Sequence, residues 1–440
     1  MRGRAKSTRF RAMSAHPRIL VLGAGGREHA LAWRLARDPE APEVLVAPGN
    51  DGMGRAFRRI ALQETDPVAV VEAARAAQVS LVVVGPEAPL AAGVSDALLA
   101  AGIPVSGASQ AAAQLESSKW FAKQVMLEAG VPTARAEAFE SLSDALAALA
   151  RFGPPWVVKA DGLAAGKGVR VSNDRSETEE FLRSCLDGGR FGDGGRRVVL
   201  EEHLSGEEAS VVAVCDGERH VLLPSARDYK RAFDGDRGPN TGGMGSYAPT
   251  PAVTAAVEQL VSDRVISPVL RTLAARGTPY RGALYAGVML TAAGVRVIEF
   301  NARFGDPETQ SMLPLLSGSL GTLLASAARG RLEPQAVQRT AGYAVTLALT
   351  DEGYPDAVRG GGVIRGLDAL ADVHVFHAGT RLEAGEWVVR GGRAAYLTAT
   401  GDSIEAARER VFAARASLSG QGFRCRSDIA ASVVQSLRAE

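Results

Sequence analysis

A lysine at the end of an apolar run, followed by a glycine-rich loop, is the clearest sign of chemistry in this chain. Lys159 follows Val157 and Val158, and the loop 162–168 carries a second lysine, Lys167. Of the 50 basic residues only six are lysines, and five of those lie between positions 119 and 230. A lysine offers a compact, flexible ammonium where arginine offers a planar fork. The window 119–230 is therefore predicted to handle phosphate.

The glycine-rich loop does not match a P-loop. Three residues separate Gly162 from Gly166, where a P-loop has four, and Gly168 stands where a P-loop has the Ser or Thr that binds magnesium. We predict a mobile loop that closes over phosphates, with Lys159 held on the preceding strand. The alternative is an ordinary hairpin in which Lys159 reaches water from an edge strand.

A second candidate site lies in the run Val297–Arg303. Residues two apart on a strand project to the same face, so Glu299 and Asn301 are expected to point together while Ile298 and Phe300 pack inward. Two oxygen ligands suit Mg²⁺, which completes its octahedron with phosphate oxygens and water. Arg303 could neutralise a transferring phosphoryl group. The alternative is a solvated strand face.

Gly23, Gly25 and Gly26 lie between a strand and a helix, a setting in which backbone N–H groups bind phosphate. The third glycine of the dinucleotide fingerprint is missing, and no ribose-binding acid follows about 20 residues later. A smaller phosphorylated ligand is favoured over a dinucleotide, and a tight turn without a ligand remains the alternative.

Other polar residues give weaker signals of chemistry. Glu201 ends a strand at an interdomain connection, where an acid could hold ribose hydroxyls. The histidines form no ligand cluster: His29 is expected on a helix near its first turn, and His374 and His377 are expected to be structural. No nucleophile–base arrangement is evident, which is consistent with phosphoryl transfer, because that reaction needs positioning and charge rather than a protein nucleophile.

The elements that must position these groups are α/β in type. From 18 to 116, apolar runs at 19–22, 44–46 and 81–84 alternate with helical patterns at 28–37 and 66–77, which predicts a doubly wound parallel domain. A helix near 117–128 precedes a small α+β unit at about 132–204. A larger region then extends to 339, and the last hundred residues read as strands joined by glycine turns.

Bulk properties limit the possible partners. A net charge of +1 over 440 residues favours neither nucleic acid nor an anionic membrane. Two long uncharged segments are broken by Gly, Pro and Ser and are poor candidates for spanning a bilayer. Three widely spaced cysteines fit no disulfide framework and suit a reducing, cytoplasmic location. Residues 1–16 are expected to be a disordered or wrongly assigned extension, with Met13 the better start.

Five motifs in order resemble the ATP-grasp superfamily and, within it, the family of phosphoribosylamine–glycine ligases. They are Gly23–Ala30, Val84–Leu90, Lys159–Gly168, Pro239–Gly245 and Phe300–Gln310. The resemblance implies an N-terminal doubly wound domain (17–116), an ATP-grasp domain of two α+β subdomains (117–339, lid about 132–204) and a mainly β C-terminal domain (340–440). It further implies a cytoplasmic enzyme that acts alone, as a monomer, on small molecules.

The implied reaction converts ATP, glycine and 5-phosphoribosylamine into ADP, phosphate and glycinamide ribonucleotide, through glycyl phosphate. By the same resemblance Arg303 is catalytic, and Glu299 and Asn301 bind Mg²⁺ or Mn²⁺. The implied ATP contacts are Lys119, Lys159, Gly166, Glu201, Leu204 and Glu208. The implied pocket for phosphoribosylamine and glycine is Gly25, Gly26, Arg27, Glu28, Asp228, Lys230, Asn240, Thr241, Gly242, Gly243 and Asp306.

Three positions depart from the family pattern. Tyr229 stands in place of the usual His, Ser319 in place of Asp, and Ala430 in place of Gly. The first places the details of the substrate pocket in doubt, and the other two are expected to concern packing. The alternatives are another ATP-grasp carboxylate–amine ligase or carboxylase, an NAD-dependent oxidoreductase, and a nucleotide sensor without catalysis.

Overall fold

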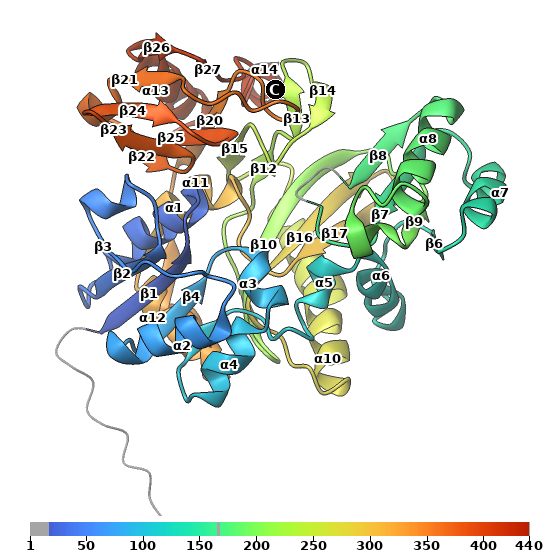
Figure 1. The fold of residues 1–440 in the computed structure, drawn as a ribbon, viewed down its shortest axis with the longest axis horizontal. Helices are drawn as coiled ribbons and strands as arrows, with labels where there is room; N and C mark the ends of the chain where they lie inside the picture. The colour runs from blue at the N-terminus through green and yellow to red at the C-terminus, as the bar shows by residue number, and fades with distance from the viewer. Residues whose placement is uncertain (1–16, 165–167, 440) are drawn as a thin grey trace, which may run out of the picture.

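The structure is a computed structural model that describes residues 17–164 and 168–439. In Figure 1 the N-terminal region (blue) and the C-terminal region (orange to red) lie on one side. A small lobe containing β6 to β9 projects on the other side, and the sheet of β10, β16 and β17 lies between them. The predicted α/β architecture is confirmed.

The N-terminal region is a parallel sheet in the order β3-β2-β1-β4-β5, as the apolar runs predict. Ile19 and Val21 belong to one hydrophobic cluster, and Leu20 and Leu22 to another, so both faces of the sheet are covered. Its elements are β1 (Arg18–Gly23), α1 (Gly26–Leu35), β2 (Glu43–Pro48), β3 (Arg58–Arg59), α2 (Pro67–Ala76), β4 (Leu81–Val84), α3 (Glu87–Ala91), α4 (Val94–Ala100), β5 (Val105–Ser106) and α5 (Gln114–Ser117).

The small lobe is an antiparallel sheet in the order β6-β9-β7-β8, packed against two helices. Strand β7 pairs with β8 and with β9, so Lys159 lies on an inner strand and only 4% of its surface is exposed. The alternative of an edge-strand lysine reaching water is therefore wrong. The elements are β6 (Ala136–Phe139), α7 (Leu142–Phe152), β7 (Trp156–Ala160), β8 (Val169–Ser172), α8 (Arg175–Leu186) and β9 (Val198–Glu201).

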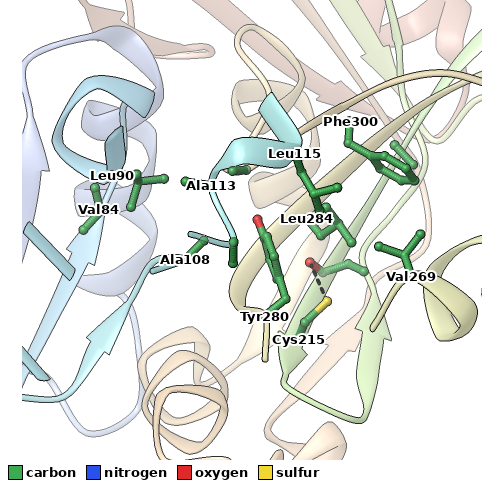
Figure 2. Close-up of a cluster of buried hydrophobic side chains, with 14 of the residues drawn as sticks. Val84, Leu90, Ala108, Ala113, Leu115, Cys215, Val269, Tyr280, Leu284 and Phe300 are labelled. Carbon is green, nitrogen blue, oxygen red and sulfur yellow. Dashed lines mark hydrogen bonds between the residues drawn. The ribbon is translucent and has the colours of Figure 1, made fainter. Parts of the chain in front are cut away.

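The central sheet, in the order β11-β10-β16-β17, is antiparallel and shares its core with the N-terminal region. Figure 2 shows this core passing from Val84 and Leu90 through Leu115 to Leu284 and Phe300. Its elements are α6 (Lys119–Glu128), β10 (Glu207–Asp216), β11 (His220–Leu222), α9 (Ala255–Val261), α10 (Ser267–Ala275), β16 (Arg281–Thr291), β17 (Gly294–Asn301), α11 (Glu308–Met312), β18 (Leu316–Gly318), α12 (Leu320–Ala328) and β19 (Val337–Arg339).

The C-terminal region is mainly β, as expected, but its main sheet does not begin at residue 340. The order β12-β15-β20-β25-β22 includes two strands from before that position, and β15 pairs with β20 over four residues. The elements are β12 (Arg227–Asp228), β13 (Arg231–Phe233), β14 (Arg237–Asn240), β15 (Gly245–Ala248), β20 (Tyr343–Asp351), β21 (Val363–Arg365), β22 (His374–His377), β23 (Thr380–Glu383), β24 (Glu386–Val389), β25 (Arg393–Gly401), α13 (Ile404–Ala416), β26 (Ser419–Gln421), β27 (Phe423–Arg424) and α14 (Ala431–Ala439).

Candidate active site

A cleft of about 440 Å³ opens where the small lobe, the central sheet and the hairpin β13–β14 meet. Its volume lies in the range of pockets that enclose small molecules, about 300–1,000 Å³. Many of the sequence-predicted site residues line it together: Lys159, Glu201, Leu204, Glu208, Asp228, Lys230, Asn240, Thr241 and Glu299. Residues that are 140 positions apart in the chain are thus brought to one cleft by the pairing of the two lobes.

Two lysines share the carboxylate of Glu201. The Nζ atom of Lys159 lies 3.0 Å from Glu201 Oε2 and donates to the carbonyl of Ile298 at 3.1 Å. The Nζ atom of Lys123 lies 3.3 Å from the same Oε2 atom. Burial lowers the pKa of Lys123 to about 8, although Glu201 acts against that shift. Glu201 therefore holds the Lys159 ammonium beside the cleft, and Lys123 is the second partner of the Glu201 carboxylate.

A β-bulge in β17 sets the direction of Glu299. Glu299 pairs with Gly287 and Val297 with Val288, which leaves Ile298 as the extra residue. Glu299 and Ile298 both line the cleft, whereas Phe300 is fully buried. The expectation that Ile298 packs inward is therefore wrong, because the bulge shifts the alternation of faces by one residue.

Glu299 lies among positive charges. Its Oε2 atom is 3.5 Å from Lys119 Nζ. Burial alone would raise the pKa of Glu299, but the ammonium groups of Lys119, Lys230 and Lys159 lower it to about 2. A carboxylate that is fully ionised beside several ammonium groups can balance them until phosphate arrives.

The donor set of Glu299 and Asn301 fits a hard divalent cation. Both belong to β17 after the bulge, and they supply a carboxylate and an amide oxygen, the ligand types that Mg²⁺ prefers. Among residues 17–164 and 168–439, no group of three or more His, Cys, Asp and Glu side chains could hold a metal ion. A cation at this pair would thus need further ligands such as phosphate oxygens and water.

Lys230, which also lines the cleft, lies between two carboxylates. Its Nζ atom is 2.8 Å from Glu208 Oε2 and 3.5 Å from Asp228 Oδ1. Lys230 lowers the pKa of Glu208. Burial raises the pKa of Asp228, Lys230 acts against that shift, and nearby carboxylates add to it. This part of the cleft therefore places one ammonium between two carboxylates.

Arg303 does not line the cleft but lies beyond the end of β17. Its Nε atom is 3.1 Å from Glu87 Oε2, and its Nη2 atom is 3.0 Å from Glu116 Oε1. Glu116 also accepts a hydrogen bond from the backbone of Ala302 at 2.8 Å. These two carboxylates hold the guanidinium in place and raise the pKa of Arg303 against the effect of burial.

The glycine loop lies apart from the cleft, at the start of α1. Gly25 N–H donates to Glu28 Oε2 at 2.7 Å, so Glu28 caps the helix and is 2% exposed. A side chain at Gly85 would collide with the Glu28 carboxylate, and one at Gly26 with the ring of Tyr396. These glycines are required by packing as well as by any ligand.

Arg393 joins two of the other predicted residues, Asp306 and Gly242. Its Nη2 atom lies 2.8 Å from Asp306 Oδ2, and its Nη1 atom donates to the carbonyl of Gly242 at 2.6 Å. Gly243 follows at φ +117, pressed against Pro307. Burial raises the pKa of Asp306, but Arg393 and then Arg27 act against it, so the pKa lies below its usual value. The predicted site therefore divides into the cleft and this second group.

Sequence reasoning missed Lys123, Glu116 and Arg393, and two predicted loop residues cannot be placed. Lys123 was one of the rare lysines, and that rarity was the available signal. Glu116 and Arg393 gave none, because their partners are more than 85 residues away. Gly166 and Lys167, like the extension 1–16, lie outside the described residues.

Tyr229, which stands where the family usually has His, does not line the cleft. The Tyr229 ring is 5% exposed and packs in the C-terminal core, and its hydroxyl accepts from the backbone N–H of Ala430 at 2.9 Å. Two departures from the family pattern therefore contact each other. Ser319, the third, caps α12 by accepting from Thr322 N–H at 3.1 Å.

The chain matches the three domains of one family along its length. They are the N domain of phosphoribosylglycinamide synthetase over residues 17–116, its ATP-grasp (A) domain over 117–309 and its C domain over 344–432. Phosphoribosylamine–glycine ligase of Caulobacter vibrioides is 47% identical over 417 residues, covering 93% of this chain and 97% of the relative. That of Streptomyces coelicolor is 46% identical over 420 residues, with 94% and 99% covered.

Solved structures agree with this match. The crystal structure of phosphoribosylamine–glycine ligase from Thermotoga maritima superposes with a TM-score of 0.80 at 35% identity, covering 94% of this chain and all of that one. Biotin carboxylase from Campylobacter jejuni superposes with a TM-score of 0.68 at 16% identity, covering 92% of each chain. The second likeness shows a shared fold.

Proposed function

Because the chain belongs to the phosphoribosylglycinamide synthetase family, and is an ATP-dependent ligase of purine biosynthesis that joins glycine to 5-phosphoribosylamine, we propose which of its residues perform that reaction. The observation that carries the proposal is the cleft in which Lys159, Glu201 and Glu299 meet. It combines paired ammonium groups with a carboxylate that is ionised at every physiological pH.

ATP occupies the cleft between the small lobe and the central sheet. Lys119 and Lys159 contact its phosphates, as point charges that neutralise negative oxygen atoms. Leu204 and Glu208 hold the base and ribose. Glu201 acts in part through Lys159, since its Oε2 atom is 3.0 Å from that ammonium. Gly166, which lies outside the described residues, belongs to the loop proposed to cover the phosphates.

The enzyme uses ATP with a divalent metal, and we assign that metal as Mg²⁺, with Mn²⁺ a substitute. Glu299 and Asn301 would hold it, and when bound it screens phosphate charge. Arg303, fixed by Glu87 and Glu116, supplies the positive charge that stabilises the transferring phosphoryl group.

Glycine and 5-phosphoribosylamine bind around the second group of residues and the adjoining end of the cleft. The glycine carboxylate attacks the γ-phosphorus and ADP leaves, which gives glycyl phosphate. The amine of phosphoribosylamine then attacks the glycyl carbonyl carbon, phosphate leaves, and the amine loses a proton. The residues assigned to these substrates are Gly25, Gly26, Arg27, Glu28, Asp228, Lys230, Asn240, Thr241, Gly242, Gly243 and Asp306.

We propose that the enzyme is a monomer of the cytoplasm that binds neither nucleic acid nor membrane. Its net charge of +1 and its free cysteines at 185, 215 and 425 support this. Across residues 17–164 and 168–439, no helix is long and apolar enough to cross a membrane. Sedimentation at micromolar concentration tests the oligomeric state.

The decisive experiment measures ADP release with each substrate omitted in turn. We expect ADP, not AMP, to form only when glycine and freshly generated phosphoribosylamine are both present. If instead ADP is released with bicarbonate and biotin but not with glycine, the chain acts as a carboxylase like those that share its fold. Mass spectrometry of the product distinguishes glycinamide ribonucleotide from a carboxylated compound.

A further inference from the structure

A buried arginine of the C-terminal region anchors one wall of the cleft. The hairpin β13–β14 contributes Arg231, Asp236 and Asn240 to the cleft lining. Among the residues that the structure describes, β13 and β14 pair only with each other, so the position of the hairpin must be fixed by other contacts. Those contacts come from the segment 424–428, nearly 200 residues further along the chain.

Arg426 supplies the central contacts. Its side chain is 1% exposed, and its Nη1 atom donates to the carbonyl of Arg231 and to Asp236 Oδ1, both at 2.9 Å. Asp428 accepts from Nε at 2.7 Å and from Nη2 at 2.6 Å, and its Oδ2 atom also accepts from Gly235 N–H at 2.8 Å. One guanidinium therefore contacts both the first residue of β13 and the turn of the hairpin.

Neighbouring residues of the segment 424–428 make further hydrogen bonds to the hairpin. Arg424 Nη1 donates to the carbonyl of Ala232 at 2.7 Å, and Ser427 N–H donates to Asp234 Oδ1 at 2.9 Å. The guanidinium of Arg426 lies 5.0 Å from the centroid of the Tyr229 ring, next to Asp228 and Lys230 in the chain. Together these contacts fix the hairpin and the strand that leads into it.

We propose that Arg426 is a positioning residue for nucleotide binding: it holds the hairpin β13–β14 against the cleft from the C-terminal region. A planar guanidinium can satisfy Asp428, Asp236 and the Arg231 carbonyl at once, whereas an ammonium lacks that geometry. The inference rests on the proposed function, because it takes the cleft to be the ATP site.

Steady-state kinetics of Arg426→Lys and Arg426→Met test the proposal. We expect the KM for ATP to rise about tenfold and the KM for glycine to rise less, because Asn240 on the same hairpin is assigned to the other substrates, with kcat within about threefold, the pattern of lost binding rather than lost chemistry. The matched control is Arg390→Met, which breaks an exposed pair with Glu383 in the same region and should behave as wild type. Equal effects on every parameter, or none, would overturn the positioning role.

Calorimetric titration with Mg·ADP separates this proposal from the proposed function. ADP affinity should fall about tenfold in Arg426→Lys and remain unchanged in Arg390→Met, whichever substrates the enzyme joins. Unaltered ADP affinity in a folded Arg426→Lys overturns the inference alone. If both Arg426 variants fail to fold, Ser427→Ala serves, since it removes an exposed side-chain contact to Asp234 and should weaken ADP two- to threefold, about the effect of one partly exposed hydrogen bond. Wild-type affinity in that variant would likewise contradict the proposal.

Discussion

At the scale of single residues, the cleft balances its lysines with carboxylates until a ligand arrives. Glu201 is paired with Lys123 and Lys159, and Glu299 lies beside Lys119. Phosphate oxygens can replace these carboxylates as partners of the ammonium groups on the cleft side. Lys123 is 2% exposed and does not line the cleft, so it acts through its buried partners: Glu201, Thr133 and the carbonyl of Ala134.

Replacing Lys123 by Met should weaken ATP binding without direct loss of a ligand contact. Glu201 would be left with Lys159 alone and would hold that ammonium more tightly, away from phosphate. We expect the KM for ATP to rise about tenfold or more, since charge-assisted hydrogen bonds contribute about 1.5–3 kcal/mol. The control is Arg276→Met, which breaks an exposed pair with Glu128 at the end of the same helix. An unchanged KM for ATP would mean that Lys123 is only structural.

Replacing Glu299 by Ala should abolish turnover while leaving the fold intact. Glu299 is the charged member of the proposed metal pair, and its low pKa keeps it ionised throughout the working range. Glu299→Gln preserves the shape and removes the charge, so we expect kcat to fall about 100-fold or more, as for other electrostatic groups of active sites. Circular dichroism checks folding. Undiminished Mg²⁺-dependent activity in either variant would show that the metal site lies elsewhere.

At the scale of elements, the sequence predicted the longest strands and helices of the N-terminal region. The runs at 19–22, 44–46 and 81–84 are strands, and the helix expected at 66–77 spans Pro67–Ala76 with Asp66 as its cap. Local periodicity carries this information because each element buries one face or both. Ile298 could not be predicted, because a bulge depends on the partner strand and breaks the period of two.

The candidate site was predictable to the extent that its motifs are local. Lys159 and Glu299 stood out by residue type and spacing, and both line the cleft. The clamp of Arg393 on Asp306 and Gly242 depends on contacts across 87 and 151 positions, which no local pattern encodes. Resemblance to a family supplied roles for the remaining residues, and substitution experiments must test them.

The hairpin β23–β24 offers a test of local backbone strain. Its two-residue turn is Ala384-Gly385, with φ of +49 and +85. An alanine in the left-handed region costs about 1–2 kcal/mol, and Asn-Gly is the favoured pair for such turns. Ala384→Asn should therefore stabilise the hairpin by about 0.5–1 kcal/mol, seen as slower hydrogen exchange in β23 and β24. Faster exchange would show that the exposed alanine makes contacts that matter more than the strain.

At the scale of the whole molecule, the N-terminal and C-terminal regions are joined through buried histidines. His29 Nδ1 accepts from the backbone N–H of His377 at 2.9 Å, and the two rings stack at 5.9 Å. Asn50 adds a bridge by donating to the carbonyls of Ala24 and His377, both at 2.8 Å. These contacts of His29, Asn50 and His377 hold the glycine loop against the C-terminal region.

Lowering the pH should weaken this contact between the N-terminal and C-terminal regions within a defined range. Burial, followed by the nearby His377, lowers the pKa of His29 to about 3, whereas the unfolded chain binds the same proton near 6.5. Between these values the unfolded state holds more protons, so stability falls as pH drops below 6.5, by about 2 kcal/mol at pH 5 from His29 alone. His29→Gln keeps an acceptor and removes the titration. Its unfolding midpoint should therefore fall less than that of the wild type between pH 7 and 5, and parallel curves would show that His29 does not control the acid response.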